Sequence, residues 1–208
     1  IAQPAHGPRQ FNPQNPQPRL IRRVAAVLRE GGVIAYPTDS VYGLGCSLYN
    51  KKGIERIYRI KRTEKTRPFS FICADLKDIS LYCKVSNYAY KTMRRLLPGP
   101  YTFILEGTKL VPKIMLTKRK TAGIRVPDNS ICLALVEALG SPIITTSASM
   151  PDGTIFLDPS LIHDFFQASI DVVIDGGPVP GDPSSVISLI DDIPEVIRKG
   201  RGDVSIFL

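Results

Sequence analysis

The segment Y-P-T-D-S-V-Y-G-L-G-C, residues Tyr36–Cys46, decides the fold class of this chain. It follows the apolar run 33–36, V-I-A-Y, which has the pattern of a buried strand. Pro37 stiffens the turn after this strand, and Gly43 and Gly45 loosen it. A strand that ends in small hydroxyl residues and glycines is typical of an α/β protein, in which backbone N–H groups approach a ligand. An ordinary strand-to-helix turn has the same glycine pattern, so the G-x-G spacing alone leaves the function open.

Helices and strands alternate along the rest of the chain. The spacing of apolar residues predicts helices over 20–28, 51–62, 87–97 and 131–139, and one that starts at Asp158-Pro159. Short apolar runs predict strands over 69–73, 101–105, 123–126, 142–146, 172–174, 186–190 and 196–198. This alternation predicts an α/β domain over 19–208, with one twisted, wound mixed sheet flanked by helices. Residues 1–18 contain five prolines and few aliphatic residues, and are predicted to form a flexible arm.

The composition excludes several classes of protein. The 208 residues are 43% hydrophobic, which is normal for a globular domain, and no stretch approaches the roughly 18 apolar residues of a membrane span. The four cysteines show no C-x-x-C spacing and are predicted to be reduced core thiols of an intracellular protein. We therefore expect a cytoplasmic protein. Because the chain starts with Ile, an organelle is the alternative if an upstream targeting segment was removed.

Metal and P-loop chemistry also lack support in the sequence. The two histidines, His6 and His163, lie far apart, which argues against a zinc site or a histidine-based triad. We predict no metal ligands from protein side chains. No G-x-x-x-x-G-K-[ST] loop is present, so the chain is not expected to be a P-loop nucleotidase.

Charge is distributed unevenly along the chain. Residues 1–125 hold 24 Lys and Arg against 7 Asp and Glu, whereas residues 126–208 hold 3 against 12. This asymmetry indicates a basic face for phosphate-rich partners, and the run Lys118, Arg119 and Lys120 is a candidate RNA surface. The alternative is that these charges only solvate helix surfaces.

Phosphate-binding residue types gather at the ends of predicted strands. Arginine, lysine, hydroxyl groups and free backbone amides hold phosphates where a P-loop is missing. Such residues follow four strands: Thr38 and Ser40, Arg125, Thr146 and Ser147, and Arg198. In an open α/β sheet, ligands lie just outside such strand ends. Local capping is the alternative role for each single hydroxyl.

A set of ordered motifs resembles the YrdC/YciO family, whose best-known members are L-threonylcarbamoyladenylate synthases. The motifs span roughly residues 19–208, and they include 36–46, Lys61 with R-P-F at 67–69, P-G-P-Y-T at 98–102, T-A-G-I-R-V-P at 121–127, T-T-S-A at 145–148, P-S-S-V at 183–186 and V-I-R-K-G at 196–200. Such an ordered set is far more specific than any one motif. The opening 15–21 and the end of the chain look more like the YciO branch.

The resemblance implies a reaction. Family enzymes combine L-threonine, bicarbonate and ATP. The threonine amine takes up CO₂ to give a carbamate, which attacks the α-phosphorus of ATP and expels pyrophosphate. The product, threonylcarbamoyl-AMP, is used to modify adenosine 37 of certain tRNAs. Such chemistry needs positioning and charge cancellation by Arg, Lys and Mg²⁺, which the nucleotide phosphates would mainly hold.

The resemblance also implies roles for individual residues. The catalytic contacts to threonine or phosphate would come from Lys61, Arg67 and Thr38. The nucleotide pocket would be lined by Arg125, Thr146, Ser147, Ser185 and Arg198. The threonine would be held by Thr38, Ser40 and Tyr42.

Two positions depart from the synthase motifs. The synthases carry a K-x-R pair and an S-x-N pair, whereas here Thr63 stands in the place of the arginine and Ser149 in that of the asparagine. Two hypotheses follow. The chain is a threonylcarbamoyladenylate synthase, or it is a nucleotide- or double-stranded-RNA-binding protein of the same fold with little or no synthase activity.

Overall fold

The computed structural model of the chain describes residues 7–62 and 69–208. Its α-helices are α1 (Pro18–Arg29), α2 (Lys51–Lys61), α3 (Leu76–Tyr82), α4 (Asn87–Leu96), α5 (Ser130–Leu139) and α6 (Pro159–Phe166). Its strands are β1 (Arg9–Gln10), β2 (Ile34–Tyr36), β3 (Gly43–Ser47), β4 (Ser70–Ile72), β5 (Tyr101–Glu106), β6 (Thr121–Arg125), β7 (Ile143–Ser147), β8 (Val172–Asp175), β9 (Ser185–Ser188) and β10 (Glu195–Arg198).

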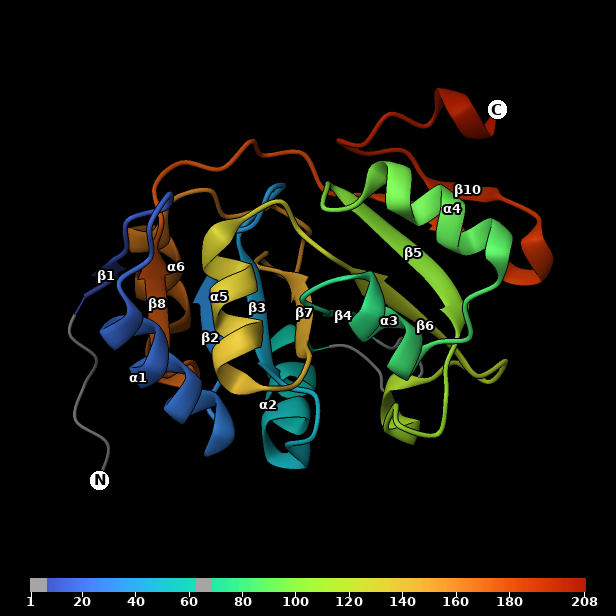
Figure 1. Cartoon of the computed structure of the whole chain (residues 1–208). Helices are drawn as coiled ribbons and strands as arrows, with labels where there is room; N and C mark the ends of the chain where they lie inside the picture. Colours follow the sequence, from blue (N-terminus) through green and yellow to red (C-terminus); the bar gives the residue numbers. More distant parts are fainter. Residues whose placement is uncertain (1–6, 63–68) are drawn as a thin grey trace.

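The ten strands form one mixed sheet in the order β1-β8-β2-β3-β7-β4-β6-β5-β9-β10. The strands β1, β8 and β2 run parallel to one another, as do β4 with β6 and β5 with β9. In contrast, β3 runs antiparallel to both β2 and β7. The sheet twists strongly along its length, so that β5 crosses obliquely the direction of β2 and β3 (Figure 1). The predicted α/β class with a twisted mixed sheet is confirmed.

Helices cover both faces of the sheet. On one face, α1 and α5 lie side by side and bury apolar residues such as Leu28 and Leu135 against β2, β8 and the start of β7 (Figure 1). On the other face, α2, α3, α4 and α6 bury a larger cluster that includes Ile57, Met93 and Ile162. The α1 and α5 cluster takes in residues of β2, β8, β7 and β4 but none of β5 or β6, so the β5 and β6 side of this face is left for a cleft.

The predicted helices and strands are confirmed, with bounds that differ by a few residues. The helix predicted over 131–139 is α5. The side chain of Asn129 caps it by accepting a hydrogen bond from the Cys132 amide at 3.1 Å. Gly140 ends it in the left-handed region, at φ 76°. The helix predicted from Asp158-Pro159 is α6, and Asp158 caps it.

The segment 36–46 differs from the strand-to-helix turn that its glycines suggest. It does not turn into a helix, because residues Gly43–Ser47 form the fully buried strand β3, which pairs back on β2. A Cβ atom at Gly45 would lie 2.5 Å from the Ile144 carbonyl oxygen and 2.7 Å from the Tyr36 ring. The glycines therefore let a tyrosine ring pack across a central strand.

Two further elements were not predicted. The helix α3 is short, and Ile79 and Tyr82 are its buried residues. Near the N-terminus, β1 pairs with β8, and Phe11 is buried against the α1 and α5 cluster. The prediction of a flexible arm over 1–18 is therefore wrong for residues 9–11, because a strand pairing and a buried aromatic ring hold them.

Other sequence-based expectations can be compared with the structure. None of the helices in the described residues is long and apolar enough to cross a membrane. The four cysteines are buried and free of disulfides, as predicted. Burial raises the pKa of the Cys46 and Cys83 thiols to about 12, so both are inert, protonated core groups.

Candidate functional site

A cleft of about 370 Å³ lies on the sheet face that α1 and α5 cover elsewhere. Ile72 packs in the α1 and α5 cluster, and it is the strand partner of Arg125, so Arg125 points to the same side of the sheet. The cleft is lined by Phe69, Ser70, Thr102, Ile104, Thr117, Thr121, Ala122, Gly123, Arg125, Thr145, Thr146, Ser147, Ser184, Val186 and Arg198.

Strand alternation makes the floor of this cleft small and polar. In β6, Ala122 and Ile124 face the core, whereas Gly123 and Arg125 face the cleft. A Cβ atom at Gly123 would lie 2.6 Å from the Ser70 hydroxyl. Any other residue at this position would therefore make the cleft shallower. The neighbouring strand β5 places Thr102 on the same floor. The floor therefore offers hydroxyl groups that can hydrogen-bond a polar ligand.

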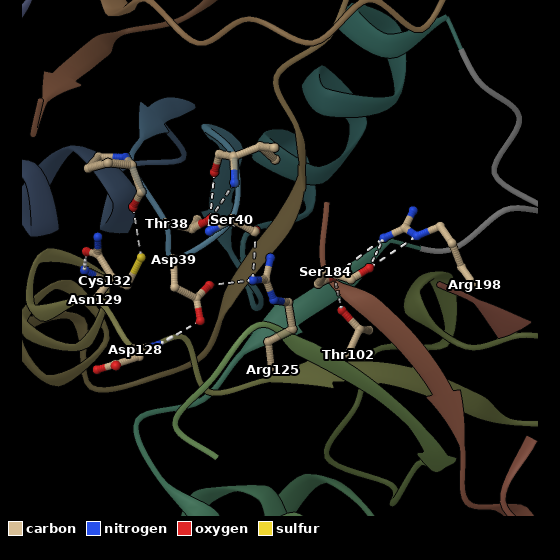
Figure 2. Close-up of polar contacts among 12 residues, drawn as sticks. Thr38, Asp39, Ser40, Thr102, Arg125, Asp128, Asn129, Cys132, Ser184 and Arg198 are labelled. Carbon is tan, nitrogen blue, oxygen red and sulfur yellow. Dashed lines mark hydrogen bonds and ion pairs between the residues drawn. The ribbon is translucent and has the colours of Figure 1, made fainter. Parts of the chain in front are cut away.

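Arg125, the last residue of β6, is a buried cation that lines the cleft. Its Nη2 donates to Asp39 Oδ1 at 2.8 Å and to Ser40 Oγ at 3.1 Å (Figure 2). The second oxygen of Asp39 accepts the Asp128 amide at 2.9 Å. Burial raises the pKa of the Asp39 carboxyl above its usual value, and the charge of Arg125 opposes that shift. Asp39 thus ties the loop after β2 to the end of β6.

Thr38 and Ser40 support this arginine from below the cleft surface. The Thr38 hydroxyl donates to the Val41 carbonyl at 2.6 Å and accepts the Ser40 amide at 3.1 Å. Both side chains are buried, and neither lines the cleft. The structure therefore places Thr38 and Ser40 behind Arg125, where they shape the loop.

Tyr42 lies further from the predicted site. Its ring is fully buried in the core, and its hydroxyl donates to the Gly177 carbonyl at 2.8 Å. It does not line the cleft. The predicted role of Tyr42 in holding threonine has no geometric support, because its ring fastens the loop after β8 to the sheet.

The opposite wall of the cleft comes from β10 and the start of β9. Arg198 donates from Nη2 to the Ser184 carbonyl at 2.8 Å and from Nε to the same oxygen at 3.2 Å (Figure 2). The Ser184 hydroxyl also contacts the Thr102 hydroxyl at 2.8 Å. Burial lowers the pKa of Arg198, and the nearby charge of Arg125 lowers it further. Both guanidinium groups belong to residues that line the same cleft.

Ser185 faces away from the cleft, unlike its predicted role. Its hydroxyl donates to the Gly202 carbonyl at 2.5 Å and accepts the Gly200 amide at 3.0 Å. Adjacent strand residues point to opposite faces, so the cleft residue of this motif is Ser184. The motif therefore reaches the cleft through Ser184, one position before the predicted Ser185.

Lys61 lies at the end of α2 and is held by the segment after β7. Its Nζ donates to the Ser149 hydroxyl at 2.5 Å and to the carbonyls of Ser147 and Ser149 at 3.1 and 3.4 Å. Burial lowers the pKa of this ammonium. Three acceptors match the three donors of a lysine, so Lys61 joins α2 to β7. Thr146 and Ser147, which are predicted to line a nucleotide pocket, both line the cleft.

The remaining predicted residues lie at the margin of the site or outside it. Lys118, Arg119 and Lys120 are exposed in the turn before β6, and Thr117 and Thr121, which flank this turn, line the cleft. The predicted catalytic Arg67 and the substituted position Thr63 lie outside the described residues. Within the described part of the chain, no group of three or more His, Cys, Asp or Glu could hold a metal ion.

Sequence reasoning missed three residues of the site. Asp39 belongs to the motif at 36–46 but had no predicted role, because a lone aspartate after a strand reads as a turn residue. Thr102 and Ser184 also lie within motifs and had no predicted role. The facing of Thr102 could have been read from strand periodicity, since Tyr101 and Phe103 on either side of it are core aromatics.

The chain is thus an α/β protein whose mixed sheet leaves an arginine-bearing, hydroxyl-lined cleft uncovered. The chain belongs to the Sua5/YciO/YrdC family, whose model, described as Telomere recombination, matches residues 26–200. It is 48% identical to the uncharacterized protein YciO of Escherichia coli (strain K12), over 95% of this chain and 97% of that protein. A crystal structure of E. coli YciO has a TM-score of 0.93 and covers 98% of this chain and 100% of that chain, at 45% identity.

More distant relatives carry a functional name. The chain is 32% identical to the threonylcarbamoyl-AMP synthase of Mus musculus, over 79% of this chain and 58% of that protein. A crystal structure of Pyrococcus abyssi Sua5 complexed with L-threonine has a TM-score of 0.85 at 28% identity, and covers 92% of this chain and 57% of that chain. The chain thus spans a little more than half the length of these synthases, and the family relation to them is clear.

Proposed function

We propose that the cleft binds ATP and L-threonine and that the protein makes threonylcarbamoyl-AMP from them and bicarbonate, with release of pyrophosphate. The observation that carries this proposal is the pair of arginines in one cleft. Arg125 and Arg198 line it together, and the charge of Arg125 lowers the pKa of Arg198. Two like charges so placed favour an anion between them, and a nucleotide phosphate is such an anion.

The floor of the cleft supplies neutral partners for the same ligand. Hydroxyl groups of Ser70, Thr102 and Thr145 and the strand-end residues Thr146 and Ser147 lie beside the two arginines. The carbamate of threonine is an anion as well, so the reaction needs both anions held together while Mg²⁺ on the nucleotide phosphates and the arginines cancel their charge. Relatedness to a Sua5 that was crystallised with L-threonine supports threonine as the amino acid.

The test of this proposal is pyrophosphate release. Protein, Mg²⁺–ATP, bicarbonate and L-threonine are incubated together, and pyrophosphate is measured with and without threonine. Release that depends on threonine is expected, at a rate below that of a typical enzyme of roughly 1 per second, because Thr63 and Ser149 replace two polar residues of the synthase motifs. Release that ignores threonine, or none at all, contradicts the synthase activity.

Nucleotide binding is tested separately by thermal unfolding. A hundredfold excess of Mg²⁺–ATP over its Kd is expected to stabilise the fold by about 2.7 kcal/mol. Arg125→Ala should remove most of the shift, whereas Arg94→Ala, an exposed arginine on α4, should leave it unchanged. An unchanged melting temperature of the parent at millimolar ATP would reject nucleotide binding.

A second candidate function is favoured by the exposed basic turn at 118–120 and by Lys61. The turn adjoins the cleft, and the ammonium of Lys61 is occupied by Ser147 and Ser149. Both features suit a nucleotide- or RNA-binding protein with little synthase activity. The double change Thr63→Arg with Ser149→Asn separates the two functions. A gain in threonine-dependent pyrophosphate release supports a weakened synthase, and no gain over an inactive parent supports the binding protein.

A further inference from the structure

Asp39 lies where three segments of the chain meet, and the proposed reaction gives this residue no role. Its carboxylate accepts Arg125 Nη2 at 2.8 Å with one oxygen and the Asp128 amide at 2.9 Å with the other. Its side chain is only 8% exposed, and that of Arg125 is only 7% exposed. Figure 2 shows the carboxylate lying between the two donors, with the Arg125 guanidinium directed towards Asp39 and Ser40.

Arg125 is poorly held by anything else. Ser40 Oγ accepts from the same Nη2 at 3.1 Å, and the Nε of Arg125 is buried with no hydrogen-bond partner among the described residues. An unpaired buried donor is unfavourable by about 1–3 kcal/mol, so the side chain would not keep this position without a strong partner. Asp39 is that partner, because a charge-assisted hydrogen bond is roughly twice as strong as a neutral one.

We infer that Asp39 is a positioning residue, which fixes the Arg125 guanidinium in the cleft for an anionic ligand. This inference rests on the proposed nucleotide binding at the cleft. Asp39 does not line the cleft, so it acts on the ligand through Arg125. The neutral amide of asparagine cannot replace it. Asparagine has one acceptor oxygen for two donors, so its NH₂ group would face either Arg125 or the Asp128 amide.

The negative charge of Asp39 and its positioning of Arg125 predict opposite effects of Asp39→Asn on anion binding, so the inference can be tested. If Asp39 mattered only through its negative charge, Asp39→Asn would tighten the binding of an anion. If it positions Arg125, the same change weakens binding. Asp128→Asn is the matched control, because it removes a negative charge beside Asp39 and keeps the backbone amide that Asp39 accepts.

The first measurement is Mg²⁺–ATP affinity by isothermal titration calorimetry. Asp39→Asn is expected to raise the Kd by about tenfold to a hundredfold, the equivalent of one charge-assisted hydrogen bond. Asp128→Asn should leave the Kd unchanged or lower it. In an Arg125→Ala background, Asp39→Asn should cause no further loss, because the two residues act in one interaction. Tighter binding by Asp39→Asn, or an equal loss in both backgrounds, overturns the inference.

The second measurement needs no ligand and separates this inference from the proposed function. In ¹⁵N-labelled protein, the Nε–H signal of Arg125 is identified by its loss in Arg125→Lys. That signal is expected to show a rigid side chain in the parent and in Asp128→Asn, and a mobile one in Asp39→Asn. If Arg125 stays rigid in Asp39→Asn, Asp39 does not position it. If the parent fails to bind ATP but Arg125 loosens in Asp39→Asn, the nucleotide proposal fails and the positioning holds.

Discussion

The Arg125–Asp39 pair is a buried ion pair beside the cleft, and burying its two charges is unfavourable. Both side chains are nearly buried, so each charge loses most of its hydration. Breaking such a pair by removing one partner costs about 3–5 kcal/mol, because the remaining charge is left buried and uncompensated. A pair of this kind contributes little net stability, so its presence beside the cleft is better explained by the geometry it imposes on Arg125.

The pKa of Asp39 gives a prediction about pH. Burial raises the pKa of the carboxyl above its usual 3.8, so the folded protein holds the Asp39 proton at pH values at which the unfolded chain has released it. This contribution to stability is fully present below the unfolded pKa and is lost as the pH rises through the folded pKa. We expect the parent to lose stability relative to Asp39→Asn as the pH rises from about 4 towards neutrality.

Urea unfolding of the two proteins over this range measures the effect. The quantity to compare is the difference in the free energy of unfolding at each pH, since other titrating groups cancel between parent and variant. A parent that instead gains stability relative to Asp39→Asn as the pH rises would contradict the prediction, because Arg125 would then stabilise the carboxylate by more than burial destabilises it.

Ser149 gives a second prediction for a single side chain. Its hydroxyl is the shortest contact of Lys61, at 2.5 Å. Removing it by Ser149→Ala leaves a half-buried ammonium with two carbonyl partners, and should lower the free energy of unfolding by about 1 kcal/mol. Ser80→Ala is the control, since the Ser80 hydroxyl makes one exposed contact within its own helix turn. Equal, negligible effects of the two changes would show that Lys61 is not held by Ser149.

Among the elements, β3 shows where sequence reasoning succeeds and where it fails. A capped helix such as α5 can be predicted from the sequence, because its cap and its apolar spacing depend on a few neighbouring residues. The strand β3, G-L-G-C-S, carries two glycines because the Tyr36 ring crosses it, and this contact depends on the sheet order. Glycine-rich sequence looks like a loop unless that order is known.

The site was predictable to a similar degree. The motifs located Arg125, Thr146, Ser147 and Arg198, all of which line the cleft. The facing of Ser184 against Ser185 depends on register with β5, and the partner of Asp39 lies 86 positions away along the chain. Neither long-range pairing has a local signal, which is why these residues had no predicted role.

The packing of β3 predicts an effect of Gly45→Ala. The added methyl would lie 2.5 Å from the Ile144 carbonyl oxygen, which belongs to the paired strand and cannot move without breaking the ladder. Overpacking of this kind typically costs about 1–3 kcal/mol. We expect a loss of that size in chemical unfolding, and no measurable loss in Gly7→Ala, where a Cβ atom meets nothing within 4 Å. A neutral Gly45→Ala would contradict the close approach of β7 and Tyr36 to β3.

Across the molecule, charge follows chain position. The first 125 residues carry a net charge of +17, and the remaining residues carry −9. The basic half supplies α1, α2, α4 and the turn before β6, whereas the acidic half supplies α6, β8 and the C-terminal segment. Such an uneven distribution orients a polyanion before any specific contact forms. The exposed turn at 118–120 places part of this basic charge beside the cleft.

This distribution predicts weak, salt-sensitive binding of tRNA or double-stranded RNA. Binding releases counterions from the RNA, so the logarithm of the association constant should fall linearly with the logarithm of the salt concentration. Charge reversal of Lys118, Arg119 and Lys120 to glutamate should weaken binding and flatten that slope.

The matched control reverses three exposed basic residues on another part of the basic half, Arg22, Arg23 and Lys91. Fluorescence anisotropy with a labelled RNA duplex, at about 50–200 mM salt as is usual for such slopes, measures both. An RNA surface at the turn requires the first triple variant to lose more affinity than the second. Equal losses would mean that total charge alone attracts the RNA, and a slope near zero in the parent would remove the RNA partner altogether.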